Sequence, residues 1–225
     1  VRAMEWFLKG AKAGNAAAQV GVGYLLNSGI GCEVDKTAAG DWFRRAAEQG
    51  NPKGQHNLAV LLREGFLGPA RMPEALDWFK KAAGQGMVES QAALGEMYYL
   101  SSDGVPQDFA KAAVWLEKAA ANGHNPSRTV FGSMLRFGNA VPVDKPRALA
   151  LFQAAAKEGY SKAMCQLADM LVEGEDTEKQ PVRAAAWYLK AASLNEAAGK
   201  AGWESLEKTL SPEQTTEAKR LASEL

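Results

Sequence analysis

Apolar positions recur along the chain with the spacing of amphipathic helices, and the helical segments come in pairs. In residues 90–123, Leu94, Met97 and Tyr98 stand at i, i+3 and i+4, which places them on one face of a helix. The sequence Ser-Ser-Asp-Gly-Val-Pro then interrupts the pattern, because Gly and Pro end helices. A second apolar stripe follows and ends at a glycine; its members are Ala112, Trp115, Leu116, Ala119 and Ala120. The pattern predicts a helix A, a turn and a helix B.

This pair recurs through the whole chain with a period of 36 or 37 residues. One position on helix B marks the period: Trp6, Trp42, Trp78, Trp115, Leu151 and Trp187. Eight residues later stands Gly or Asn, which tolerate the left-handed conformation that ends a helix: Gly14, Gly50, Gly86, Gly123, Gly159 and Asn195. Sixteen residues after the marker, an apolar residue precedes a small one: Val22-Gly23, Leu58-Ala59, Leu94-Gly95, Phe131-Gly132 and Leu167-Ala168, with the degenerate Trp203-Glu204 last. Such a period is typical of a solenoid of stacked repeats, and we interpret the tryptophans as core packing residues.

The repeats predict one elongated domain over residues 1–225. Residues 1–15 form a partial repeat with helix B alone, residues 16–195 form five full repeats, and residues 196–225 form a degenerate repeat with a C-terminal capping helix. Ser211, Pro212 and Gln214 mark the start of that last helix as N-cap, first helical residue and capping-box residue. Because the first helix B lacks a helix A before it, we expect the natural protein to extend further at its N-terminus.

More specific motifs occupy the turns and helices B. Residues 29–35 read Gly-Ile-Gly-Cys-Glu-Val-Asp, residues 104–112 read Gly-Val-Pro-Gln-Asp-Phe-Ala-Lys-Ala, and residues 187–192 read Trp-Tyr-Leu-Lys-Ala-Ala. Over about nine-tenths of its length the chain resembles the Sel-one-like repeat (SLR) family, which is related to tetratricopeptide repeats. The turns at 65–71 and 173–177 depart from the family pattern. The resemblance implies an all-α protein of bacterial type, a right-handed α/α superhelical solenoid that binds other proteins.

The resemblance also implies that helices A line a concave groove and helices B the convex surface. Within helix A the fifth, sixth, eighth and ninth places face the core, which leaves the third, seventh and tenth places facing the groove. In chain order the third places hold Val20, His56, Ala92, Thr129 and Cys165. The seventh places hold Tyr24, Val60, Glu96, Ser133 and Asp169, and the tenth places hold Asn27, Arg63, Tyr99, Arg136 and Val172. From this stripe we predict six partner-binding residues of the types that serve protein interfaces: His56, Arg63, Glu96, Tyr99, Arg136 and Asp169.

Composition excludes two classes of partner. The chain holds 26 Lys and Arg against 26 Asp and Glu, so it lacks the basic character of nucleic-acid or anionic-membrane binding proteins. No apolar run approaches the length of a transmembrane helix, and residues 1–14 contain no uninterrupted apolar signal core. We expect no nucleic-acid partner and no membrane insertion. The compartment stays open in the sequence, and the resemblance favours a periplasmic or exported location.

Candidate chemistry is sparse. His56, His124, Cys32 and Cys165 stand in separate repeats, so we expect neither a metal site nor a disulfide. Four clustered carboxylates lack the spacing of a calcium loop, and we interpret them as a solvated turn: Glu173, Glu175, Asp176 and Glu178. No nucleophile motif of the Ser-x-x-Lys type occurs in a suitable setting. We therefore expect no cofactor and no catalytic residue.

Three functions follow, in order of preference. The first is a non-catalytic adaptor or scaffold that holds a peptide or partner domain in the groove. The second is an immunity protein that inhibits a secreted toxic enzyme. Tight binding of such an enzyme with loss of its activity would support this function. The third is a hydrolase or penicillin-binding protein; the relatives linked to that activity carry a disulfide in each repeat, which this chain lacks.

Overall fold

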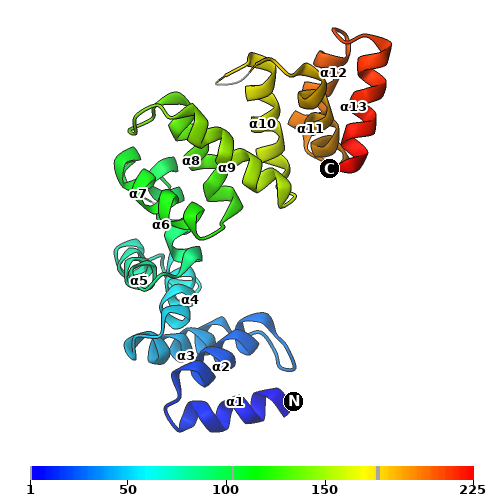
Figure 1. Cartoon of the computed structure of the whole chain (residues 1–225). Coiled ribbons are helices and arrows are strands. Elements are labelled where there is room, and N and C mark those ends of the chain that lie inside the picture. Colours follow the sequence, from blue (N-terminus) through cyan, green and yellow to red (C-terminus); the bar gives the residue numbers. More distant parts are fainter. Residues whose placement is uncertain (1, 103, 176–177) are drawn as a thin grey trace. The chain divides into compact units, whose positions relative to one another are not determined.

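The computed structural model describes residues 2–102, 104–175 and 178–225, and these residues form thirteen α-helices and no strand. Figure 1 shows the helices following one another as antiparallel pairs joined by short turns. This confirms the all-α repeat fold. The chain divides into two compact units, unit 1 (Val1–Trp115) and unit 2 (Leu116–Leu225).

Unit 1 contains three helices A, α2, α4 and α6, that alternate with helices B. Its helices are α1 (Arg2–Lys12), α2 (Ala16–Ser28), α3 (Lys36–Glu48), α4 (Pro52–Arg63), α5 (Met72–Gly84), α6 (Val88–Leu100) and the first half of α7 (Phe109–Ala121). Consecutive helices from α1 to α6 pack against each other, and α2 also contacts α4. Helices A therefore lie side by side in this unit.

Unit 2 continues the same alternation after the second half of α7. Its helices are α8 (Asn125–Phe137), α9 (Lys145–Lys157), α10 (Ser161–Glu173), α11 (Pro181–Ser193), α12 (Ala197–Glu207) and α13 (Pro212–Glu224). Helix α10 contacts both α8 and α12, while α13 packs on α11. Ser211 caps α13 with the predicted capping box, in which its hydroxyl and Gln214 bond each other's backbone N–H groups.

Helices B end where the glycine period predicts. The residues eight places after each marker all have positive φ, from 84° to 90° for the five glycines and 62° for Asn195. The tryptophan prediction, in contrast, is wrong in detail. Trp6 is 74% exposed, and the other four tryptophans at marker positions are partly exposed. Arg45 lies over the Trp42 ring and Lys81 over the Trp78 ring, so these indoles pack beneath cationic side chains at the surface.

In five of the six cases the residue after the marker fills the core instead, whereas Phe7, which follows Trp6, is 40% exposed. Phe43, Phe79 and Phe152 are at most 2% exposed. The Phe43 ring packs directly on Gly23 of the preceding helix A, where an added Cβ would stand 2.6 Å from the ring. The Phe152 ring packs in the same way on Gly132, with a corresponding distance of 2.7 Å. Gly23 and Gly132, the small residues of two apolar-small pairs, therefore make room for an aromatic ring from helix B.

A buried polar contact links consecutive repeats, and our sequence analysis missed it. Gln19 Nε2 donates to the carbonyl of Ala11 at 3.3 Å, and Gln19 Oε1 accepts from Gln49 Nε2 at 2.7 Å. The same contacts recur 36 residues later among Gln55, Ala47 and Gln85. In unit 2, Arg128 takes this position and bonds the Ala120 carbonyl and Glu158. The recurrence of glutamine at a 36-residue interval, at Gln19 and Gln55, is the feature of the sequence that could have indicated this contact.

The ring contact at Gly23 predicts a steric cost for added side-chain volume. Gly23→Ala and Gly84→Ala both gain the intrinsic helix preference of alanine, about 0.5–1 kcal/mol. A Cβ at Gly84 meets no heavy atom within 4 Å, so only Gly23→Ala overpacks the core. We expect Gly23→Ala to be less stable than Gly84→Ala by about 1–3 kcal/mol in urea unfolding. Equal stability of the two variants would contradict the role of this contact.

Candidate partner-binding site

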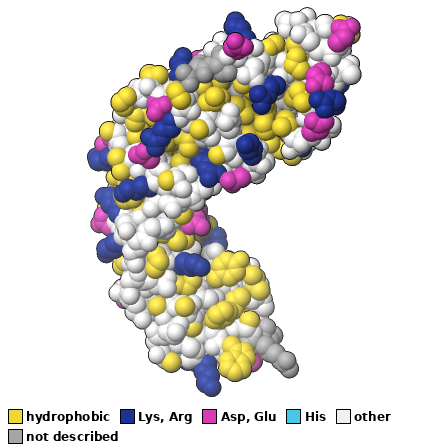
Figure 2. All heavy atoms as spheres, in the orientation of Figure 1, with side chains coloured by type: hydrophobic (Ala, Val, Ile, Leu, Met, Phe, Trp, Pro, Cys, Tyr) yellow, Lys and Arg dark blue, Asp and Glu magenta, His cyan; other side chains and the backbone are white. Residues whose placement is uncertain are grey.

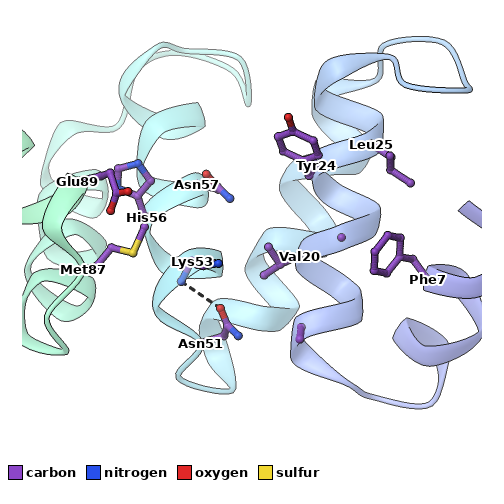
Figure 3. Close-up of a pocket in the computed structure, with 12 residues that line it drawn as sticks. Phe7, Val20, Tyr24, Leu25, Asn51, Lys53, His56, Asn57, Met87 and Glu89 are labelled. Carbon is purple, nitrogen blue, oxygen red and sulfur yellow. Dashed lines mark hydrogen bonds between the residues drawn. The ribbon is translucent and has the colours of Figure 1, made fainter. Parts of the chain in front are cut away.

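A pocket of about 560 Å³ opens on the helix A side of unit 1. Figure 3 shows it between α2 and α4, with α1 on the side of α2 away from α4 and the start of α6 beside α4. The apolar lining residues are Phe7, Ala17, Val20, Gly21, Tyr24, Leu25 and Met87. The polar ones are Asn51, Lys53, His56, Asn57 and Glu89. The pocket thus combines apolar walls with a few hydrogen-bonding groups, which is the usual composition of a ligand site.

The α2 wall of the pocket is uncharged and mostly apolar, and Figure 2 shows hydrophobic side chains gathered on this end of unit 1. Helix α2, Ala16–Ser28, contains no charged residue. At Gly21 the Phe7 ring covers the backbone, since an added Cβ would lie 2.6 Å from it. Across the opening from α4, Asn57 points toward Tyr24, which is 55% exposed. Among the described residues, neither the Asn57 amide nor the Tyr24 hydroxyl has a hydrogen-bond partner, so both are available to a ligand.

His56 is the predicted site residue that lines the pocket. Its Nδ1 lies 2.8 Å from the hydroxyl of Ser90, which is fully buried. The edge of its ring meets Phe79 with the ring centres 5.6 Å apart. Burial lowers the pKa of His56 below the ordinary value of 6.5; the Glu89 carboxylate opposes this shift and the Arg63 guanidinium adds to it. The imidazole is therefore neutral at neutral pH.

The other predicted residues of unit 1 lie outside the pocket lining. Arg63 is partly exposed, near the Phe79 ring and 3.6 Å from Glu64. Glu96 is exposed, as expected for the groove stripe. Tyr99 is half-buried, because its ring packs edge-on against Phe109. Of the four predicted residues in unit 1, the structure thus brings His56 alone into the pocket lining.

In unit 2, Arg136 is buried, which corrects its predicted place on an exposed stripe. The residue is 5% exposed, and its guanidinium lies 2.9 Å from Glu173 and 2.9 Å from Glu175. Glu175 also forms an ion pair with Lys145. Although burial raises the pKa of Glu175, the hydrogen bond from Arg136 lowers it overall. The arginine side chain is thus occupied within the fold.

The same contacts correct the interpretation of residues 173–178 as a solvated turn. The Glu175 side chain is only 16% exposed because it binds Arg136, whereas Glu173 and Glu178 are exposed as expected. Asp176, the fourth carboxylate of that prediction, lies outside the described residues.

Asp169 is half-buried and also engaged. It accepts hydrogen bonds from the Tyr188 hydroxyl and from Gln166 Nε2. The third places of helix A are mostly buried, contrary to the predicted stripe: Ala92, Thr129 and Cys165 are 5–8% exposed. Burial raises the pKa of the Cys165 thiol to about 12, so the thiol is not a reactive nucleophile at neutral pH.

The repeat pattern matches a known protein family. The model of the Sel1 repeat matches residues 1–15, 16–51, 52–87, 88–124, 132–160 and 161–196. The chain belongs to the Sel1 repeat family. Sel1 repeat proteins are protein-interaction scaffolds and are generally non-catalytic.

Solved Sel1 repeat structures share this fold. A Sel1 repeat protein from Oxalobacter formigenes is 28% identical, with a TM-score of 0.76 over 93% of this chain and 85% of that one. A protective antigen of uropathogenic Escherichia coli with an SLR fold is 26% identical, with a TM-score of 0.66 over 98% of this chain and 55% of the antigen. An uncharacterized protein of Neisseria meningitidis is 32% identical over 93 residues, 41% of this chain and 19% of that protein. The Sel1 repeat chain thus spans about half of the antigen and a smaller part of the Neisseria protein.

Two further features, a metal-binding cluster and a membrane-spanning helix, are absent from the described ranges of this Sel1 repeat chain. No three His, Cys, Asp or Glu side chains converge there to hold a metal ion. In the same ranges, no helix combines the length and apolar content needed to cross a bilayer.

Several residues that line the pocket were missed in the sequence. Val20 and Tyr24 lie on the predicted stripe but are not among the six predicted partner-binding residues. Asn57 falls on the fourth place of helix A, which the place count did not assign to the groove, and Met87 belongs to a turn. The uncharged composition of residues 16–28 was the signal that could have located the pocket.

The two predicted arginines of this Sel1 repeat chain have different energetic roles. We expect Arg136→Ala to lower the free energy of unfolding by about 2–4 kcal/mol, because it removes a buried guanidinium and leaves the partly buried Glu175 with Lys145 as its one remaining ion-pair partner among the described residues. Arg63→Ala loses an exposed pair and should cost under about 1 kcal/mol. Chemical denaturation of both variants at neutral pH measures the difference. Similar losses in both would contradict the assignment of Arg136 to the fold.

Proposed function

We propose that this Sel1 repeat chain is a non-catalytic adaptor that binds a peptide or a partner domain on the helix A side of unit 1. The observation that carries the proposal is the pocket itself, about 560 Å³ with apolar walls and available polar groups. An accessible apolar cavity of this size is a common feature of binding sites in soluble proteins. Membership of a family of interaction scaffolds supports the same function.

The lining offers both an anchor and a means of orienting a bound chain. Tyr24 is an exposed aromatic residue on a rigid helix, and aromatic side chains often dominate binding energy at protein interfaces. The Asn57 amide supplies one acceptor and two donor hydrogens, which match the N–H and C=O groups of a peptide backbone. Because helices carry both residues, binding orders little of the scaffold and loses little entropy.

The pair of His56 and Ser90 does not support an enzymatic alternative. A histidine nitrogen 2.8 Å from a serine hydroxyl has the spacing of a base and nucleophile. The Ser90 side chain is fully buried, however, so a substrate in the pocket has no access to its oxygen. The contact holds α4 against α6 and orients the imidazole.

Binding on this surface should depend on Tyr24. We expect Tyr24→Ala, which alters an exposed side chain, to raise the Kd of the native partner by about 30-fold or more, the equivalent of about 2 kcal/mol. Lys80→Glu changes an exposed residue of helix B and serves as the matched control. Affinity purification from native lysate with each bait identifies the partner, and calorimetry with the purified partner gives the Kd.

Equal affinity of Tyr24→Ala and the wild type would place the partner elsewhere on the chain. A captured enzyme that loses its activity in the complex would support the inhibitor alternative, with the same surface as its binding site.

A further inference from the structure

We propose that the unit 1 pocket selects an uncharged apolar peptide segment and releases it on acidification, because the segment fits only against a neutral His56. The inference rests on the proposed function and specifies both the chemistry of the partner and its control by pH.

The charges around the pocket favour an uncharged occupant. Helix α2 contributes no charge. Lys53 from α4 and Glu89 from α6 are both exposed and of opposite sign, so they cancel at the rim. A charged side chain that enters the pocket against its apolar lining, such as Val20, would lose water without gaining a partner. An apolar side chain instead gains about 25 cal/mol for each Å² removed from water.

Figure 3 also shows how the backbone of such a segment could be held. Asn57 on α4 and Tyr24 on α2 point into the opening from opposite sides. An extended segment that runs between them exposes its N–H and C=O groups to both polar ends, while its side chain enters the apolar interior. The backbone contacts do not depend on sequence, so the apolar interior provides the selectivity.

His56 connects this fit to the proton concentration. The charged groups that act on it are Arg63 of its own α4 and Glu89 of α6, and its ring packs against Phe79 of α5. Lys53 of α4, on the side that faces α2, and Tyr24 of α2 line the same pocket. Phe79 and the buried Ser90 lie against two sides of the ring, and the partly exposed imidazole also lines the pocket, from which water reaches it. An apolar segment displaces this water and destabilises the charged form of the imidazole further.

The direction of the pH effect follows from this desolvation. Burial already holds the pKa of His56 below 6.5 in the free protein, and a bound apolar segment lowers this pKa again. As the pH falls, His56 becomes protonated in the free protein before it does in the complex. Affinity is therefore highest above the pKa of His56 in the free protein and falls as the pH drops through this value. Because binding releases one proton, Kd rises by up to about tenfold for each unit by which the pH falls within this window.

The test uses the capped tripeptide acetyl-Ala-Trp-Ala-amide, which carries an apolar side chain and no charge. Backbone amide signals of Val20, Tyr24 and Asn57 report binding in two-dimensional NMR titrations of the full chain. The imidazole C–H signals give the pKa of His56, and Kd is measured about one unit above and one unit below that pKa. We expect a several-fold higher Kd at the acidic value, with circular dichroism confirming that the protein stays folded.

Two histidine variants isolate the proton involved. His56→Asn keeps an amide near the Ser90 hydroxyl but does not titrate, so its Kd should be the same at both pH values. His124→Asn removes the other histidine of the chain, which caps α8 outside the pocket lining, and should keep the pH dependence of the wild type. The same pH dependence in His56→Asn, a pH-independent wild type, or a His56 that does not titrate in the folded protein would overturn the coupling.

Charged tripeptides test the chemistry of the occupant. Acetyl-Ala-Glu-Ala-amide and acetyl-Ala-Lys-Ala-amide should bind at least several-fold more weakly than the tryptophan peptide, and tighter binding of either would overturn the selectivity. If none of the three shifts the pocket signals, the inference fails. The proposed function is decided separately, by the Tyr24→Ala measurement with the native partner.

Discussion

The close contact between a helix B aromatic ring and a small helix A residue sets the geometry of the repeats in which it occurs. Phe43 lies on Gly23 and Phe152 on Gly132, at distances that leave no room for a Cβ without a shift. The ring thereby fixes the separation of the two helices in each of these two repeats. The marker tryptophan, one residue earlier, points toward the surface. A leucine at position 151 is compatible with this, because the neighbouring Phe152 fills the core.

Buried polar contacts add register to this packing. A ring on a glycine tolerates small sliding movements, whereas Gln19 requires one particular carbonyl, that of Ala11, and one particular side chain, that of Gln49. An unmade hydrogen bond at a buried site costs about 1–3 kcal/mol, so slipped arrangements are disfavoured. The replacement of this glutamine by Arg128 in unit 2 keeps the contact with the preceding carbonyl. We infer that these side chains keep successive repeats in register.

The sequence predicted the repeat, the helix ends and most of the core, because these depend on local rules. Gly50 or Asn195 ends a helix through its own backbone, and Leu94 is buried through its place on one helical face. The candidate site was harder to predict, because it depends on side chains from separate elements. Arg136 occupies a place that the count assigns to the groove, yet carboxylates 37 and 39 residues away bury it. No spacing rule specifies that Glu175 reaches this arginine.

The contrast between the two units is the reason why we propose the pocket, and not the predicted charged stripe, as the site for a partner. On helices A of unit 2, Arg136 and Asp169 already bind carboxylates and a hydroxyl within the fold, so an incoming group would have to replace existing bonds. On α2 and α4 of unit 1, Tyr24 and Asn57 have no such bonds among the described residues, and the walls between them are apolar. Binding energy comes from polar groups that have no hydrogen-bond partner in the free protein and from apolar surface that is still in contact with water. Residue type alone favoured the arginines, but their existing partners in the fold remove that advantage.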